Sequence, residues 1–273
     1  MPNDGTARRL RRVLSGIALS ALCLAATGCA GKRVALPADP GAPLPDFASI
    51  HTELSRACSG IRTLTAELSL SGRAGDQKLR GRVLAGFERP ASMRLEGVAP
   101  FGAPAFILVA RAGEGTLLLP RDERVLRDAK PEEILGALTG VALAPADLQA
   151  ILTGCVVPAP HATAGRVHGN GWASLDLEGG ATLYVQREGA RWQLRAARRG
   201  PWQVDYTMGT GTLPASVALH ADTPVRVDLT AAIAQAETNA DLDASAFTVT
   251  IPGNAAPLSI DTLRANGPLR ASP

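Results

Sequence analysis

Two stretches of this chain alternate apolar and polar residues with a period of two, and this alternation limits the fold more than any other feature. Successive side chains of a β-strand point to opposite faces, so the pattern predicts strands with one buried and one exposed face. It occupies residues 61–127 and 172–230, in short runs bounded by Gly, Pro or Asp. The fold is therefore expected to be mainly β, with antiparallel neighbours.

The runs are short and follow one another closely, which is typical of hairpin-connected strands. Predicted strands cover residues 61–71, 79–87, 91–98, 105–110, 115–119, 124–127, 172–178, 182–187, 191–197, 202–208, 215–220 and 225–230, and a last strand is expected at 247–251. Residues 158–171 are expected to form a loop. No internal repeat or linker divides the strands, so a single antiparallel barrel of about 11–12 strands is expected.

Three segments have the period of an amphipathic helix. One begins at Pro45 and ends at Gly60, and two shorter ones, 131–138 and 145–152, have Pro near the first turn and Gly after the end. A curved sheet leaves an apolar concave face that must be covered, so we expect a half-open barrel with helices covering that face. The barrel domain is expected over residues 46–252, followed by a C-terminal tail, 253–273.

Small residues interrupt the apolar face of the predicted sheet, at Gly81, Ala85, Ala173 and Ala196. Two interiors fit this pattern. One is a fully packed core, which the pattern alone favours because most apolar stripes are core. The other contains a cavity for an apolar ligand. The candidate lining residues are Leu68, Leu70, Val83, Met93, Leu95, Leu135, Leu138, Leu148, Ile151, Trp192, Leu194 and Tyr206.

The N-terminus has the form of a secretion signal. Four arginines between residues 8 and 12 precede the apolar run 13–26, and small residues lead to Cys29. The run is shorter than the ~20 residues that a membrane-spanning helix needs. Residues 26–29 resemble the bacterial lipobox, which implies a signal peptide over residues 1–28 and acylation of Cys29; the alternative is an ordinary cleaved signal.

The residue after Cys29 bears on the membrane that would hold the anchor. In enteric bacteria an Asp at this position retains lipoproteins in the inner membrane, and Ala30 stands here instead. The resemblance therefore implies a lipid anchor in the outer membrane, with the domain facing the periplasm. Residues 29–45 are rich in Pro and are expected to form the acylated Cys and a flexible tether.

Charge argues against a nucleic-acid partner. The chain has 28 Lys and Arg against 25 Asp and Glu, and the first 28 residues hold four Arg and one Asp. The remaining residues are therefore balanced, at 24 of each sign. A neutral domain lacks the basic surface that nucleic acids require.

Two cysteines lie within the predicted domain, Cys58 and Cys155. In an oxidising compartment they can form a disulfide, but both are equally suited to be small buried hydrophobic residues. The sequence leaves these two interpretations open.

Motifs for catalysis or metal binding do not emerge from the sequence. The four histidines, His51, His161, His168 and His220, lack the spacing at which two side chains reach one metal ion. A nucleophile elbow, a phosphate-binding loop and a dinucleotide fingerprint are all missing. We therefore expect a protein that is not an enzyme and uses neither cofactor nor metal.

A family resemblance adds to this interpretation. Residues 131–154, PEEILGALTGVALAPADLQAILTG, resemble the middle of the LolB family of outer-membrane receptors for lipoprotein localisation. The segments APFG at 99–102, WQVDY at 202–206 and LP at 213–214 resemble further LolB segments in the same order. The family fold is a half-open antiparallel barrel covered by helices, as the periodicity predicts.

The resemblance implies a function in lipid handling. It implies a monomer that accepts the acyl chains of lipoproteins from a periplasmic carrier of the LolA type and releases them into the outer membrane. In the family a Leu in the loop matching Pro100, Phe101 and Gly102 touches lipid, so Phe101 is the expected membrane-insertion residue; the alternative is a Phe tucked under its loop. Two other functions stay open: a carrier or sensor of another lipid, and a non-catalytic envelope scaffold.

Overall fold

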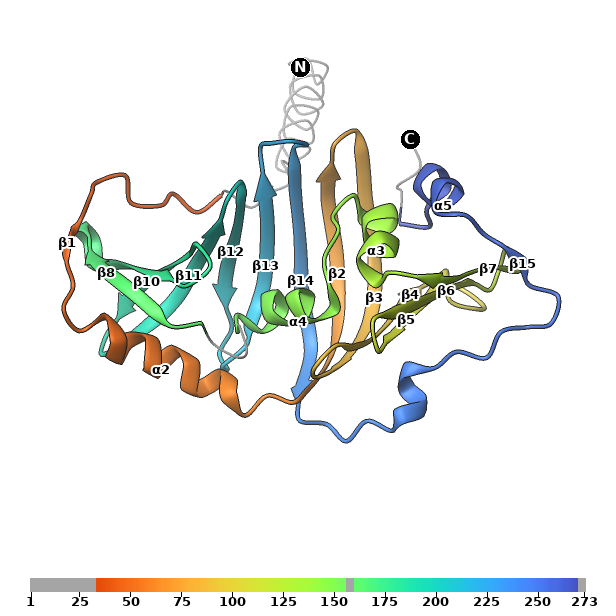
Figure 1. The fold of residues 1–273 in the computed structure, drawn as a ribbon, viewed down its shortest axis with the longest axis horizontal. Coiled ribbons are helices and arrows are strands. Elements are labelled where there is room, and N and C mark those ends of the chain that lie inside the picture. Colours follow the sequence, from red (N-terminus) through yellow and green to blue (C-terminus); the bar gives the residue numbers. More distant parts are fainter. Residues whose placement is uncertain (1–32, 156–159, 270–273) are drawn as a thin grey trace, which may run out of the picture. The chain divides into compact units, whose positions relative to one another are not determined.

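The computed structural model describes residues 33–155 and 160–269, which form a single 15-stranded sheet with helices packed against it (Figure 1). The proposed signal and Cys29 lie outside the described residues. The strands are β1 (Ala42–Pro43), β2 (Thr63–Ala74), β3 (Gln77–Glu88), β4 (Ser92–Val98), β5 (Phe106–Arg111), β6 (Glu114–Leu119), β7 (Arg124–Ala129), β8 (Ala162–Val167), β9 (Trp172–Leu177), β10 (Ala181–Glu188), β11 (Arg191–Arg199), β12 (Trp202–Met208), β13 (Pro214–Ala221), β14 (Val227–Thr238) and β15 (Ala256–Pro257). The helices are α2 (Phe47–Ser59), α3 (Pro131–Thr139), α4 (Pro145–Thr153) and α5 (Ile260–Asn266), with short 3-10 turns η2 (Gly169–Gly171) and η3 (Ala244–Phe247).

The strand order is β1-β8-β9-β10-β11-β12-β13-β14-β2-β3-β4-β5-β6-β7-β15, and all neighbours are antiparallel except β7 and β15. Strands β14 and β2 pair along most of their length and join the two halves of the sequence. Gly72 permits this pairing, because a Cβ there would lie 2.0 Å from the carbonyl oxygen of Asp228. Among the described residues no pairing joins β1 to β15, so the sheet stays open. The predicted half-open, mainly β fold is confirmed.

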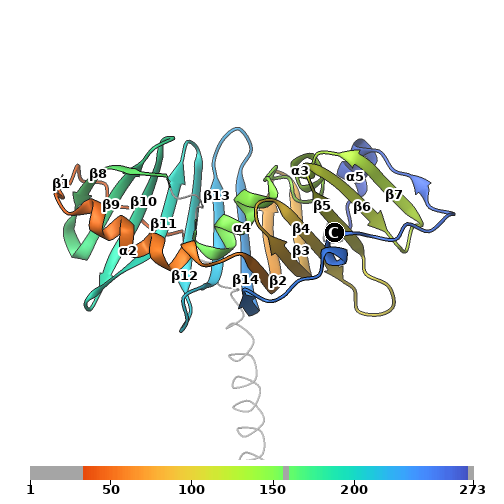
Figure 2. The same cartoon turned by 60° about the horizontal axis from the view of Figure 1, so that its bottom comes forward.

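Three helices cover one face of the curved sheet or its border (Figures 1 and 2). Helix α2 packs along β8 and β11, and α3 and α4 lie over the concave face. Both α3 and α4 begin with Pro at the first helical position, where no N–H partner is needed. Each ends at a glycine in the left-handed conformation, Gly140 or Gly154, as helix ends favour. No helix in the described part of the chain is long and apolar enough to cross a bilayer.

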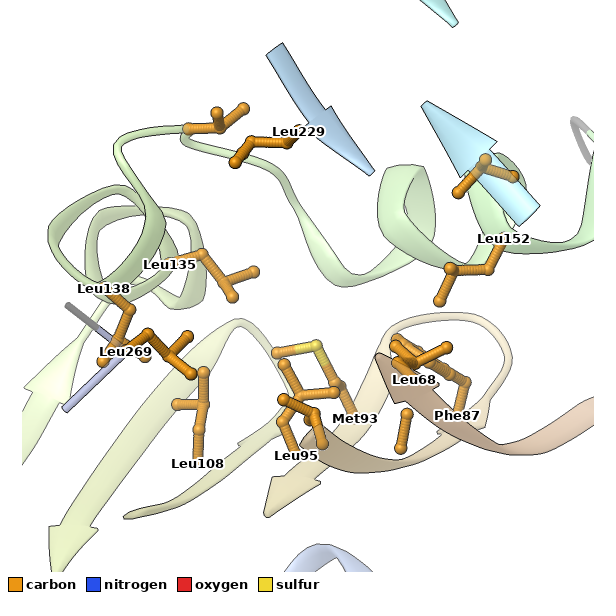
Figure 3. Packing of buried hydrophobic residues seen from close by; sticks show 14 of the residues in the cluster. Leu68, Phe87, Met93, Leu95, Leu108, Leu135, Leu138, Leu152, Leu229 and Leu269 are labelled. Atoms are coloured by element: carbon orange, nitrogen blue, oxygen red, sulfur yellow. The ribbon is translucent and has the colours of Figure 1, made fainter. Parts of the chain in front are cut away.

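The main apolar core lies between the sheet and the helices (Figure 3). Leu135 and Leu138 of α3 point toward Leu108 and Met93 of the sheet. Phe87 and Met93 are fully buried. The inward positions predicted from the two-residue period therefore form the core.

Three predictions about the strands differ from the structure. The sheet has 15 strands instead of about 11–12. Residues 162–167, expected in a loop, form β8, whose side chains do not alternate in burial and which is held by backbone pairing with β9. The predicted strand at 247–251 is wrong. Its place is taken by η3, which Asp243 caps through the amide of Ser245, and by an irregular segment after it. Arg94 donates hydrogen bonds to the carbonyl oxygens of Ala246 in η3 and of Thr248 in that segment.

The described part of the expected C-terminal tail, residues 253–269, packs on the domain. Residues Ala256 and Pro257 pair with β7, and α5 packs against α3. Leu263 is only 1% exposed, and Leu269 is buried in the main core. The barrel domain therefore does not end at residue 252.

Candidate functional site

A cavity of about 120 Å³ lies between the concave face of the sheet and its helical cover. Strands from both halves of the chain form its floor, and α3, α4 and the loop between them form its roof. The lining residues are Leu68, Leu70, Val83, Leu95, Phe106, Leu138, Thr139, Val141, Leu143, Leu148, Ile151, Leu152, Val217, Leu219, Leu229, Ala231 and Leu269. The meeting of β14 with β2 thus brings distant segments to one site.

The lining chemistry is almost wholly apolar. Thr139 is the one polar side chain among the lining residues, and its hydroxyl already donates to the carbonyl oxygen of Leu135 at 2.8 Å. A ligand here would find neither a charge nor a free polar group among these side chains. The cavity therefore suits a hydrocarbon chain.

The predicted lining residues divide into two groups. Seven of them line the cavity: Leu68, Leu70, Val83, Leu95, Leu138, Leu148 and Ile151. Met93, Leu135, Leu194 and Tyr206 are buried in the core outside the lining, and Trp192 packs against that core. Among the lining residues that sequence reasoning missed are Leu219 and Leu229, which followed the same alternation, and Val141 and Leu143, which lie in a loop without periodicity.

The cavity is narrow in this structure. Pockets for small molecules usually measure ~300–1,000 Å³, whereas this one measures about 120 Å³. Leu143 and Leu148 of the roof and Leu70 of the floor are partly buried residues at its border.

The loop between β4 and β5 carries the most exposed large apolar side chain of the described residues, Phe101, at 87% exposure. Gly102 takes a positive φ of 74°, which turns the chain sharply. Arg121 supports the loop from the β6–β7 connection, donating through Nε to the carbonyl oxygen of Ala103 at 3.1 Å and through Nη2 to that of Phe101. Phe101 is thus held in solvent by a braced loop, and the alternative of a tucked ring does not describe this structure.

A disulfide joins Cys58, at the end of α2, to Cys155, just after α4, with 5.4 Å between their Cα atoms. Both residues are buried, with Ile61 and Leu213 beside them. The bond ties the end of the roof helix α4 to the helix that borders the sheet.

The outer face of the sheet carries a buried polar cluster around His220, which neither motif nor spacing revealed. Nδ1 of His220 lies 2.9 Å from Oδ1 of Asp228, and its Nε2 forms an ion pair at 3.3 Å with Oδ2 of Asp205. The carboxylate of Asp205, helped by Asp228, raises the pKa of His220 against the opposing effect of burial. Burial alone would raise the pKa of Asp205, but hydrogen bonds from His220, the Val34 amide and Gln203 outweigh it and lower that pKa.

The other histidines are dispersed. His161 pairs with Glu178 at 3.1 Å on the surface, and His168 lies against Asp39 at 3.0 Å. His51 on α2 has a pKa lowered chiefly by burial. Within residues 33–155 and 160–269, groups of His, Cys, Asp and Glu that would hold a metal ion are not found.

No family model and no curated protein matches the sequence. Among solved structures, a LolA superfamily protein from Nitrosomonas europaea matches with a TM-score of 0.50 at 10% identity, over 73% of this chain and 98% of that one. A protein domain from Vibrio parahaemolyticus assigned to outer-membrane lipoprotein sorting matches with a TM-score of 0.47 at 10% identity, over 73% and 95% of the chains. The lipoprotein LppX from Mycobacterium tuberculosis matches with a TM-score of 0.31 at 13% identity, over 73% and 99%.

The fold therefore resembles that of the LolA superfamily protein from Nitrosomonas europaea. An identity of 10% shows the fold alone, and the particular LolB assignment has no support from this likeness.

Proposed function

We propose that this protein is an outer-membrane-anchored periplasmic lipoprotein that binds acyl chains between its sheet and the helices α3 and α4. The observation that carries the proposal is the cavity, whose lining offers hydrocarbon contacts from both the sheet and the roof and whose only polar side chain is already satisfied. Burial of apolar surface contributes ~25 cal/mol per Å², so a chain of many methylene groups would bind there without a polar contact.

The proposed cargo is a lipoprotein received from a periplasmic carrier of the LolA type. We propose that the roof rises on binding, because the cavity of about 120 Å³ is smaller than the usual pocket for a small molecule. The roof consists of two short helices joined by the loop 140–144, and its lining residues Val141 and Leu143 lie on that loop. We propose that Leu68, Leu70, Val83, Leu95, Leu138, Leu148 and Ile151 contact the chain, with Met93, Leu135, Trp192, Leu194 and Tyr206 reached only as the cavity widens.

Release into the membrane is assigned to the loop of Pro100, Phe101 and Gly102. An exposed aromatic ring on a braced loop enters the interface of a bilayer readily. Acylation of Cys29 would hold the protein at the same membrane, and no covalent step, cofactor or metal is part of this function.

Native mass spectrometry tests the proposal on residues 30–273 expressed in the periplasm, so that the protein carries no anchor of its own. Bound masses of phospholipid or of an acylated peptide support an acyl-binding cavity. A clean apo mass that persists after lipid is added contradicts it and favours an envelope scaffold.

A transfer assay then separates the remaining candidates. Acceptance of radiolabelled lipoprotein from a loaded LolA-type carrier supports the receptor function. Bound phospholipid without transfer points to a carrier or sensor of another lipid.

A further inference from the structure

The segment of residues 33–45, here called the strap, crosses the outer face of the sheet from β12 to β1 (Figure 1). Its proline content predicts a flexible tether, but the structure binds it at both ends. The strap matters because Cys29, the proposed acylation site, stands only four residues before Arg33.

The first binding point is Val34. Its amide donates to Oδ2 of Asp205 at 2.6 Å, and its carbonyl oxygen accepts from Nε2 of Gln203 at 3.0 Å. Gln203 also donates to Oδ1 of Asp205 at 2.7 Å. Asp205 is 6% exposed although it belongs to the outer face of β12. A buried carboxylate needs hydrogen-bond donors, and the strap backbone supplies one of them.

The second binding point lies at the other end of the strap. Asp39 pairs with His168 at 3.0 Å, and His168 in turn contacts the hydroxyl of Ser174 at 3.0 Å. The amide of Leu44 donates to the carbonyl oxygen of Gly165 at 3.0 Å, and β1 pairs with β8. The strap is therefore fixed at residues 34 and 39–44.

The ion pair between Arg33 and Asp222, at 3.0 Å, shows where the strap begins. Asp222 directly follows β13, in the β13–β14 loop. Exposed ion pairs stabilise little, but this one places the start of the strap beside that loop. The chain that leads from Cys29 thus joins the domain at this edge of the sheet.

Phe101 lies on the same edge. Six consecutive strands of the sheet are antiparallel neighbours: β13, β14, β2, β3, β4 and β5. Their loops β13–β14, β2–β3 and β4–β5 therefore all lie at one edge of the sheet, the one formed by the ends of β13, β2 and β4. Four strand spacings of ~4.8 Å separate the first loop from the third, about 20 Å. Val225 of the β13–β14 loop is also exposed, at 50%. Two exposed apolar side chains and the start of the strap therefore share this edge.

We propose that the strap orients the domain on a lipid bilayer: it directs the acyl anchor of Cys29 to the edge that carries Phe101 and Val225, so that this edge faces the membrane. The inference rests on the proposed anchoring at Cys29. Four extended residues span at most ~14 Å, so a bound strap keeps this edge close to the bilayer surface. A flexible tether of residues 29–45 would leave the orientation free.

The test compares two insertions in the mature chain, with Cys29 coupled to a maleimide-bearing phospholipid and bound to vesicles of phosphatidylcholine and phosphatidylglycerol. About 12 Gly and Ser residues, which form a flexible coil, are inserted between residues 31 and 32 in one variant. The same insert lies between Pro37 and Ala38, inside the strap, in the other. Membrane proximity is read as the quenching by brominated acyl chains that Val225→Trp adds to that of the three native tryptophans, Trp172, Trp192 and Trp202. It is compared with the quenching that Ala190→Trp adds in the β10–β11 turn on the opposite edge.

Without an insert, quenching of Val225→Trp should exceed that of Ala190→Trp several-fold. The insert before residue 32 should abolish the difference, and the insert inside the strap should preserve it, because both ends of the strap stay bound. Equal quenching at both edges in the parent, or loss of the difference with both inserts, overturns the inference. Coupled lipid replaces cellular acylation, so absence of acylation at Cys29 would contradict the proposed function without affecting this result.

Discussion

Filling the cavity should stabilise the protein and weaken its lipid binding. Ala231 lines the cavity on β14, opposite Leu70 of β2 and Val217 of β13. Ala231→Leu adds three carbon atoms, and each buried methylene contributes ~0.8 kcal/mol, so the free energy of unfolding should rise by up to about 2 kcal/mol. The cavity of about 120 Å³ has room for them. Urea denaturation measures this change, and native mass spectrometry measures the lipid-bound fraction.

A matched control stands next in the sequence. Ala232 is exposed on the opposite face of β14, so Ala232→Leu should change stability by less than ~0.5 kcal/mol. It should leave lipid binding unchanged. Destabilisation by Ala231→Leu would show that this space is already filled, and stabilisation with undiminished lipid binding would show that the lipid binds elsewhere. Either result refutes the assignment of the cavity.

Three further variants test other parts of the molecule. Phe101→Glu removes an exposed ring that would contribute ~2 kcal/mol to binding in a membrane. Vesicle flotation of the anchor-free domain should therefore show about 30-fold weaker binding, with an unchanged free energy of unfolding. Equal binding of the variant and the parent would count against membrane insertion by this loop. Replacing Cys58 and Cys155 by Ser opens a loop with a sequence separation of 97 residues. Urea denaturation should then show a free energy of unfolding that is lower by ~2–5 kcal/mol. An unchanged free energy of unfolding would contradict a structural role of the disulfide. Because the folded pKa of His220 is raised, its contribution is full below pH ~6.5 and is lost as pH rises through the folded pKa. His220→Gln should flatten the dependence of the free energy of unfolding on pH in that range. An unchanged slope would show that the pH dependence arises from another group.

The alternation of residues predicted most of the sheet because it reports which side chains face the core. It also predicted four residues of the cavity, Leu68, Leu70, Val83 and Leu95, since inward positions of β2, β3 and β4 line it. The helical period predicted the other three, Leu138, Leu148 and Ile151. The sequence attributed the cavity to small residues in the apolar face of the sheet, whereas the structure indicates another cause. Gly81, read as a gap in the apolar face, faces Leu269, which lies 2.9 Å from the position of a Cβ. The space arises instead where α3 and α4 do not fill the curve of the sheet.

The strap could not be predicted from the sequence, because its partners are distant in the chain. The Val34 amide and Asp205 are 171 residues apart. Polar residues are expected on the outer face of a half-buried strand, so Gln203, Asp205 and His220 fitted the alternation and gave no sign of being buried. Prolines in residues 37–45 were read as flexibility, whereas here this segment is bound to the sheet through β8 and His168. Similarly, β8 lies between the two-residue strand β1 and β9, is defined by backbone pairing and shows no apolar period.

We expect the disulfide to limit which part of the roof moves when an acyl chain enters. Cys155 follows α4 directly, and its bond to Cys58 fixes this end of the helix to α2. The loop 140–144 carries Val141 and Leu143 over the cavity and has no such bond. Entry of an acyl chain should therefore move this loop while the end of α4 stays in place. Hydrogen exchange with and without bound lipid should show altered protection in residues 139–144 and little change in 150–154; the reverse pattern would place the opening at α4 and refute this assignment.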